Sequence, residues 1–192
     1  MSARAKASVF EPPGGILIWI IVVVELLTFG AGLVVFAVQK RSEPAVFALG
    51  HARLSQPVAL ANTVILLTGG WFMANALTRF RGEQHRAASA WTGAAMLSGF
   101  AFLALKGWEY ADKLDHGLTL RHDSFFTLYW LLTVFHCMHV AVAVVILTVF
   151  RISLRRGNCT AAHSESFEAG GIFWHLCDLV WLLLYPVLYL LP

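Results

Sequence analysis

Long apolar runs separated by short polar segments occupy most of the chain. Five runs reach about 20 residues or more, at residues 16–38, 58–78, 88–108, 124–150 and 170–191. A bilayer has a hydrocarbon core of about 30 Å, which about 20 apolar residues of helix can cross. The pattern therefore predicts an all-α fold, a polytopic bundle of five transmembrane helices. The connections are short and no internal repeat is visible, so residues 1–192 are expected to form a single membrane domain.

Proline and glycine residues punctuate these runs. Pro44 and Pro57 bracket the segment after the first run, which we predict to be a loop. Gly69–Gly70 is expected to loosen the second helix, and Pro186 to kink the outer half of the last one. The first run is longer than the apolar region of about 7–15 residues in a signal peptide, so we expect it to stay in place as an anchor helix.

Composition agrees with a membrane protein and excludes other classes. Hydrophobic residues make up 58% of the chain and charged residues 13%, against about 45–50% and about 25% in soluble domains. The net charge of +3 arises from 14 basic and 11 acidic residues that are scattered between apolar blocks, so no nucleic-acid partner is expected. Three cysteines are an odd number and imply no disulfide framework.

Basic residues in the connecting segments predict the orientation, because cytoplasmic loops carry an excess of Lys and Arg. One side holds eight of them: Arg4, Lys6, Arg79, Arg81, Arg86, Arg151, Arg155 and Arg156. The other side holds six, which lie mostly beside acidic residues: Lys40, Arg41, Arg53, Lys106, Lys113 and Arg121. We therefore expect a cytoplasmic N-terminus and a C-terminus outside.

Of the ionisable residues inside the predicted spans, five matter most: Glu25, His136, His139, His175 and Asp178. Such residues cost at least about 2.5–3.5 kcal/mol at the centre of a membrane helix, so each suggests a pairing or functional role. The two histidines of the fourth span, and the His–Asp pair of the fifth, are each spaced i,i+3 and share a helical face. A rise of about 1.5 Å per residue puts all five at a similar depth. We predict one buried cluster between the first, fourth and fifth spans.

Several roles for this cluster remain open. The pairs can be packing contacts between helices, can take part in proton handling, or can bind a metal with help from Cys137 and Cys177. A single b-type haem between His136 or His139 and His175 would make the chain an electron carrier. An independent transporter is a further alternative, although no repeats or broken helices are evident. Nucleophile elbows, phosphate loops and paired Cys motifs are absent, so nothing indicates a hydrolase or a kinase.

Several motifs resemble those of subunit III of haem-copper cytochrome c oxidases. The stretch 167–182 reads FEAGGIFWHLCDLVWL and is similar to the family's FEAxxxYWHFVDxVWL, which includes Glu168, Trp174, His175 and Asp178. Phe135–Val140 is similar to the family's FHGxHV, with Cys137 in place of its glycine. Asn62 falls in an LxNT motif, Glu109 in an xEY motif, and Glu25 matches the glutamate of an early helix.

The resemblance implies a non-catalytic accessory subunit in respiratory electron transport. It would hold no haem, copper or other metal, would pack against the catalytic subunit of a haem-copper oxidase or nitric oxide reductase, and would support its stability or proton uptake. Phospholipid contacts and a place in the bacterial inner membrane follow from the same resemblance. The two helices that begin seven-helix members are missing here, and residues 121–126 look like the five-helix, NorE type that accompanies nitric oxide reductase.

Overall fold

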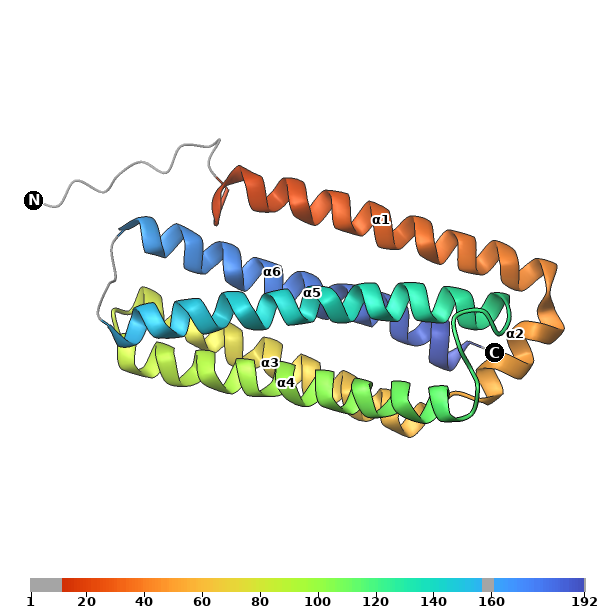
Figure 1. Cartoon of the computed structure of the whole chain (residues 1–192). Coiled ribbons are helices and arrows are strands. Elements are labelled where there is room, and N and C mark those ends of the chain that lie inside the picture. Colours follow the sequence, from red (N-terminus) through yellow and green to blue (C-terminus); the bar gives the residue numbers. More distant parts are fainter. Residues whose placement is uncertain (1–11, 157–160, 192) are drawn as a thin grey trace, which may run out of the picture.

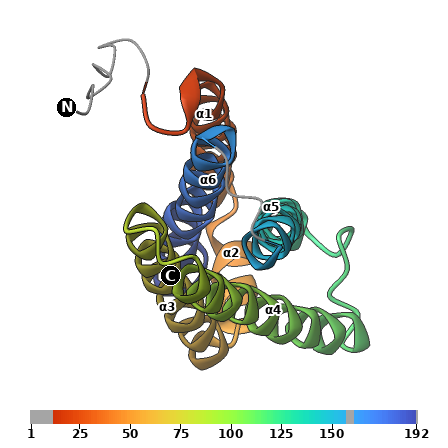
Figure 2. The same ribbon diagram turned by 90° about the vertical axis from the view of Figure 1, so that its left-hand side faces the viewer.

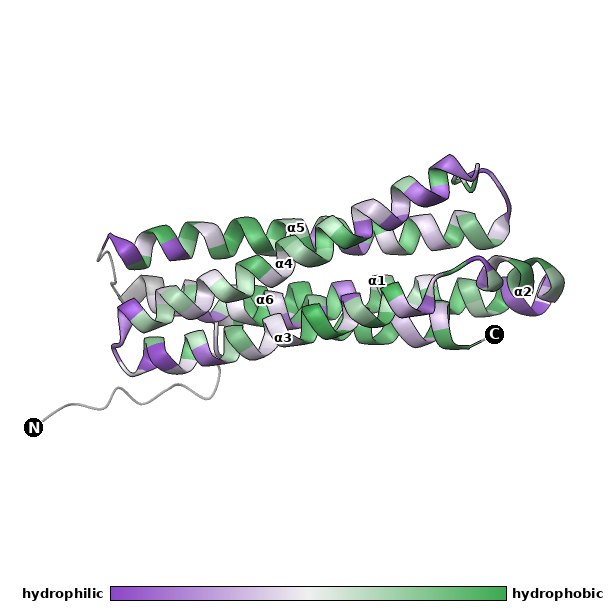
Figure 3. Cartoon of the chain, turned by 90° about the horizontal axis from the view of Figure 1, so that it is seen from below, coloured by the Kyte–Doolittle hydropathy of each residue, from purple (hydrophilic) through white to green (hydrophobic). Residues whose placement is uncertain are grey.

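Five long helices run side by side and account for all five predicted spans (Figure 1). The computed structural model describes residues 12–156 and 161–191. The long helices are α1 Gly15–Ser42, α3 Gln56–Arg81, α4 His85–Asp115, α5 Ser124–Arg155 and α6 Ala161–Tyr185, the last continued by the π-helix η1 Pro186–Leu190. Their hydrophilic positions gather toward the two ends of the bundle (Figure 3). Length and hydropathy together indicate a multi-pass membrane protein.

The segment between the first two spans was predicted to be a loop, and this is wrong. It contains a short helix, α2 Pro44–Ala52. Proline suits the first turn of a helix, where its missing N–H leaves no bond unmade. Phe47 then anchors α2 in the bundle. Its ring centroid lies 5.0 Å from that of Phe36 and 5.5 Å from that of Phe125. Burial of this ring gives the nine residues of α2 the tertiary contact that so short a helix needs.

Local chemistry sets several helix ends. The Asp123 carboxylate accepts a hydrogen bond of 2.8 Å from the Phe126 N–H and so caps α5. At the other end of the chain, α-helical bonding stops at Tyr185, one residue before Pro186. Proline cannot donate the next helical hydrogen bond, and the chain continues as η1. This change carries Tyr189 into the core, where it is fully buried.

Helices α3, α4, α5 and α6 form the packed core, and α1 lies at its edge against α6 and α5 (Figure 2). Only Ile18, Phe29 and Phe36 of α1 are buried. In the core, Gly69 and Gly99 let the Trp174 ring approach α3 and α4, since a Cβ at either position would stand within 3 Å of that ring. The expectation that Gly69–Gly70 loosens the helix is therefore wrong, because the missing side chains permit close packing.

Candidate functional site

Glu25 of α1 lies beside His139 of α5, one of the two histidines predicted as its partner. Glu25 Oε2 is 3.2 Å from His139 Nε2, and both side chains are mostly buried. The other ring nitrogen, Nδ1, is 2.8 Å from the Phe135 carbonyl oxygen. A carbonyl only accepts, so Nδ1 is the donor and Nε2 is the atom left to meet the carboxyl group. Among the described residues, Glu25 Oε2 has no hydrogen-bond partner, so the pair is a close contact that is ionic only when His139 is protonated.

His136 is one turn away from His139 and belongs to the aromatic core. It is fully buried, stacks on Trp181 at 5.2 Å and meets the edge of Phe102 at 5.6 Å between centroids. In the part of the chain that the structure describes, neither of its ring nitrogens has a hydrogen-bond partner. The gap between His136, His139 and Glu25 leaves no room for a water molecule. His136 therefore acts here as a packed ring beside the ionic contact.

His175 and Asp178 pair with each other on a different face of α6. Their Nδ1 and Oδ2 atoms are 3.2 Å apart, and the pair lies against Gly70 of α3. The α6 residues that border the Glu25 contact are instead Leu176, Cys177 and Val180. The predicted single cluster of five residues is therefore wrong. The rotation of α6 about its axis turns His175 and Asp178 toward α3.

The most deeply buried charges lie elsewhere, near the C-terminal end of α4. Lys106, Glu109 and Lys113 have side chains only 1–2% exposed. Lys106 Nζ lies 2.8 Å from Glu109 Oε2, and Lys113 Nζ lies 3.4 Å from Glu109 Oε1. We call these three residues the lysine–glutamate cluster. One carboxylate thus serves two ammonium groups inside a membrane-spanning helix.

Two tyrosines from other elements complete this cluster. Lys106 Nζ donates to the hydroxyl of Tyr189 at 2.7 Å and to that of Tyr129 at 3.1 Å. Both hydroxyls in turn donate to Glu109 Oε1, at 2.9 Å from Tyr129 and 3.0 Å from Tyr189. All three donors of Lys106 are therefore used. The cluster ties α4 to α5 and η1, and its buried charges are compensated by hydrogen bonds as buried ions require.

The sequence analysis counted Lys106 and Lys113 among the charges of a connecting loop, and that was wrong. The predicted third span ended at residue 108 because charges follow it, whereas α4 continues to Asp115. The signal was present in the spacing, since Lys106, Glu109 and Lys113 stand at i, i+3 and i+7 and so share one helical face. Glu109 was singled out, but only for its place in the family motif.

The other residues of the family motifs, Trp174, Asn62 and Glu168, lie at contacts between helices or in the core. Trp174 is fully buried against Gly69 and Gly99. Asn62 is also fully buried, and within the described residues its amide atoms have no hydrogen-bond partner. Glu168 Oε1 accepts from Arg81 at 2.9 and 3.0 Å, which joins the end of α3 to the start of α6.

Within residues 12–156 and 161–191, no three His, Cys, Asp or Glu side chains converge as a metal site. Cys137 Sγ contacts the Tyr110 hydroxyl at 3.4 Å, and Cys159 lies outside the described residues. His175 lies on the α3 side of α6, so it does not oppose His136 or His139 as haem ligands would.

Comparison with known proteins extends over most of this chain. A family model described as cytochrome c oxidase subunit III matches residues 47–191. Proteins named cytochrome c oxidase subunit 3 are similar: that of Pyricularia grisea is 32% identical over 130 residues (68% of this chain, 47% of the relative), and that of Synechocystis sp. is 30% identical over 131 residues (68% and 55%). That of Corynebacterium diphtheriae is 27% identical over 146 residues (73% and 68%). The chain spans about half the length of the first two relatives.

Proposed function

Because the chain belongs to the cytochrome c oxidase subunit III family, we propose that it is a non-catalytic accessory subunit of a haem-copper terminal reductase in respiratory electron transport. The observation that carries the proposal is the family match over residues 47–191, which includes both histidine motifs and the lysine–glutamate cluster. The partner is the catalytic subunit of a nitric oxide reductase or of a cytochrome c oxidase. The chain supports the stability or the proton uptake of that subunit.

The closed packing around the ionisable residues favours a supporting role over a substrate site. No water molecule fits beside Glu25 and His139, and the lysine–glutamate cluster is satisfied by its own tyrosines. A substrate would need an open pocket with free polar groups. These residues instead fix the positions of the helices that they join.

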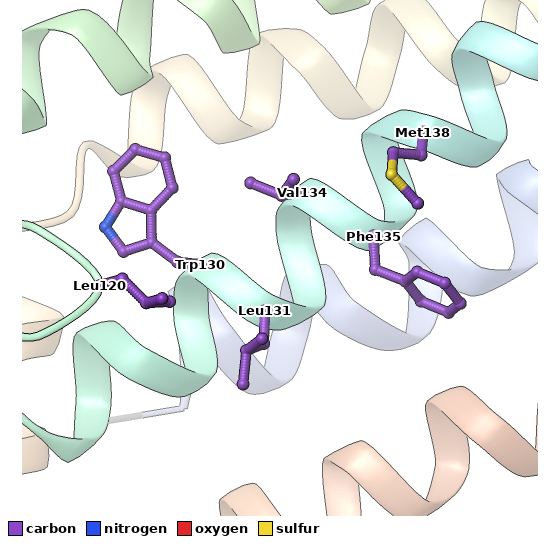
Figure 4. Close-up of a pocket in the computed structure, with 6 residues that line it drawn as sticks. All are labelled: Leu120, Trp130, Leu131, Val134, Phe135 and Met138. Carbon is purple, nitrogen blue, oxygen red and sulfur yellow. The ribbon is translucent and has the colours of Figure 1, made fainter.

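Lipid is proposed as a ligand of the membrane-facing surface. An apolar pocket of about 390 Å³ lies along α5, lined by Leu120, Trp130, Leu131, Val134, Phe135 and Met138 (Figure 4). Leu131 and Met138 are more than half exposed. No polar atom contributes to the lining, which suits an acyl chain and offers nothing to a polar solute.

We propose that the chain carries no redox group of its own, since His175 turns away from the two histidines of α5. Optical spectra and metal analysis of the purified chain test this. We expect no haem absorption and no stoichiometric metal. A haem bound in a one-to-one ratio would instead support the single-haem electron carrier.

The proposed orientation puts the N-terminus in the cytoplasm and the C-terminus outside, in a bacterial inner membrane. Burial of Lys106 and Lys113 in α4 supports it. These two lysines no longer count as loop charges. Within the described residues, four basic residues then remain at one end of the bundle and six lie at the other. The excess of basic residues marks the cytoplasmic end.

Deletion of the chain from its native membrane tests the accessory role. We expect the partner reductase to keep its haem content and initial turnover, and to lose yield, sustained activity or proton supply. Re-expression of the wild-type chain should restore them. Unchanged yield and sustained activity after deletion, together with solute or ion flux in vesicles that hold this chain alone, would favour an independent transporter.

Co-purification identifies the partner. The chain is extracted from native membranes in a mild detergent, and the haem proteins that accompany it are identified by mass spectrometry and by their reduction of nitric oxide or of oxygen. A nitric oxide reductase would support the NorE-like assignment. An oxygen-reducing oxidase would place the chain with the oxidases, and the absence of any haem protein would contradict the accessory role.

A further inference from the structure

His175 is exposed although it lies in the middle of a membrane span. Its side chain is 45% exposed, whereas that of its partner Asp178 is 9% exposed. Glu25 and His139, which also lie inside the spans, are only 20% and 14% exposed. By the helical rise, His175 lies about 17 Å along the span Ser164–Leu190, near the centre of a hydrocarbon core of about 30 Å. Ionisable residues at this depth almost always face the bundle interior or a water-filled cavity.

Helix α3 fixes one edge of the His175 ring. A Cβ at Gly70 of α3 would clash with Asp178 Oδ2 and would stand 3.5 Å from His175 Nδ1, so the missing side chain lets the pair lie against α3. His175 Nδ1 is 3.2 Å from Asp178 Oδ2. Among the described residues, His175 Nε2 has no hydrogen-bond partner. Nε2 is therefore the ring nitrogen that remains for a group outside this chain.

The protonation states that leave the pair neutral all place a hydrogen on Nε2. A net charge in the hydrocarbon core is costly, so we expect a neutral pair. In one state a protonated Asp178 donates to Nδ1 of a neutral ring, and in the other an imidazolium donates from Nδ1 to the carboxylate. The ring keeps its Nε2–H in both states. His175 thus presents a hydrogen-bond donor to the outside of the bundle.

Apolar side chains accompany this donor. Leu179 and Leu182 stand at i+4 and i+7 from His175 on α6 and are 44% and 42% exposed. We call these three residues the His175 stripe. Helix α6 packs against both α1 and α3, and it lies between them in Figure 2. Acyl chains would cover the two leucines, but hydrocarbon offers no acceptor to the Nε2–H, and a hydrogen bond left unmade in the membrane core is costly.

A helix of another protein supplies both kinds of contact. Within the bilayer core a protein segment must satisfy its own backbone, so the partner segment is a transmembrane helix. It carries apolar side chains for the two leucines and one hydrogen-bond acceptor for His175. A second copy of this chain fits poorly, because two copies joined by the same face would set one Nε2–H opposite the other and would add only leucines.

We propose that the His175 stripe packs against a transmembrane helix of the catalytic subunit, which presents a hydrogen-bond acceptor to His175 Nε2 near the centre of the membrane. This inference rests on the proposed function, since it takes the catalytic subunit as the partner. A serine or threonine hydroxyl, an amide oxygen or a carboxylate can be the acceptor. The proposal turns α6 toward the catalytic subunit and the outer face of α5 toward lipid.

Photocrosslinking in native membranes tests this placement. The photoreactive residue p-benzoylphenylalanine is incorporated in place of Leu179 and, as a matched control, in place of Val142, which is 50% exposed on α5. Helices α3 and α5 lie on different sides of α6 (Figure 2). We expect irradiation to link the Leu179 position to the haem-bearing subunit and the Val142 position to no protein. Mass spectrometry of the adducts identifies the linked chain.

The outcomes separate this proposal from the accessory role. If the haem-bearing subunit co-purifies but is crosslinked from the Val142 position and not from the Leu179 position, the accessory role stands and the His175 stripe is not the contact. An adduct between two copies of this chain at the Leu179 position would overturn the choice of partner. If no haem protein co-purifies, the accessory role and this proposal both fail.

Substitutions of His175 measure the contribution of the donor. His175→Leu removes the N–H and should weaken binding of the catalytic subunit about three- to twentyfold, the range measured for hydrogen bonds between membrane helices. His175→Gln keeps an N–H donor and should weaken binding less. The readout is the fraction of haem-bearing subunit that stays with the tagged chain when the detergent extract is diluted. Wild-type binding of His175→Leu, or equal losses in the two variants, would overturn the role of the donor.

Leu179→Trp tests the surface without changing the polar pair. The larger side chain at an exposed position should leave the fold intact and weaken binding more than about fivefold, as overpacking does where side chains fit closely. Val142→Trp is the matched control and should leave binding unchanged. Circular dichroism of each purified variant checks that it is folded. Equal effects of the two tryptophan substitutions would overturn the proposal.

Discussion

At the level of single side chains, Glu109 pairs with two buried lysines. It is the one carboxylate in contact with both Lys106 and Lys113. Glu109→Gln should destabilise the chain by about 3–5 kcal/mol, because it leaves two buried ammonium groups without an anion. Unfolding of the purified chain in detergent micelles, followed by circular dichroism, measures the loss.

Glu168→Gln is the matched control for that substitution. It removes the carboxylate of a pair whose partner, Arg81, is 61% exposed, and exposed pairs contribute about 0–1 kcal/mol. If Glu109→Gln were no more destabilising than Glu168→Gln, the buried cluster would not hold α4, α5 and η1 together as described.

The Glu25–His139 contact predicts a coupling that a double-mutant cycle can measure. Glu25→Gln and His139→Gln, alone and together, should show an interaction energy of about 0.5–3 kcal/mol, as for residues in direct contact. The cycle of Glu25→Gln with His175→Gln should give less than about 0.5 kcal/mol, since His175 lies on the other face of α6. Comparable coupling in both cycles would restore the single cluster that the structure excludes.

Between helices, close packing depends on Gly69 and Gly99. A Cβ at Gly69 would meet the Trp174 ring at 2.8 Å, and one at Gly99 would meet it at 2.9 Å. Gly69→Ala or Gly99→Ala should therefore push α3 or α4 away from α6 and cost about 1–3 kcal/mol. Thermal unfolding in micelles checks the direction and size of the effect.

Gly107→Ala is the control on α4, because its Cβ would enter open space. Alanine favours the helix over glycine by about 1 kcal/mol, so this variant should be neutral or slightly more stable. If all three substitutions behaved like Gly107→Ala, the packing of Trp174 between α3, α4 and α6 would be refuted.

For the molecule as a whole, the distribution of basic residues predicts its direction in the membrane. The turn between α3 and α4 and the end of α5 share one basic end, and the C-terminus lies at the other (Figure 1). Alkaline phosphatase, which is active outside the cytoplasm, should be active when fused after Pro192 and inactive when inserted at Glu83. The reverse pattern of activities would invert the orientation.

Apolar run length and helical periodicity were enough to predict the number of spans, their approximate limits and the polar positions inside them. All five spans formed helices, because a membrane helix makes its backbone hydrogen bonds within its own segment and needs no partner to define it. Glu25, His136 and His139 also came from sequence, since an ionisable residue in an apolar run stands out wherever the helix packs.

Only the tertiary structure decided which of those residues meet. Periodicity fixes the face a side chain shares with its neighbours on one helix, but not the rotation of that helix against another. The rotation of α6 follows from Trp174 entering the space at Gly69 and Gly99, and it separates His175 and Asp178 from Glu25. The sequence also does not show which side chains of other helices will surround Lys106, Glu109 and Lys113, so their charges suggested a loop. Their burial becomes favourable only when Tyr129 of α5 and Tyr189 of η1 supply the hydrogen bonds that water would otherwise provide.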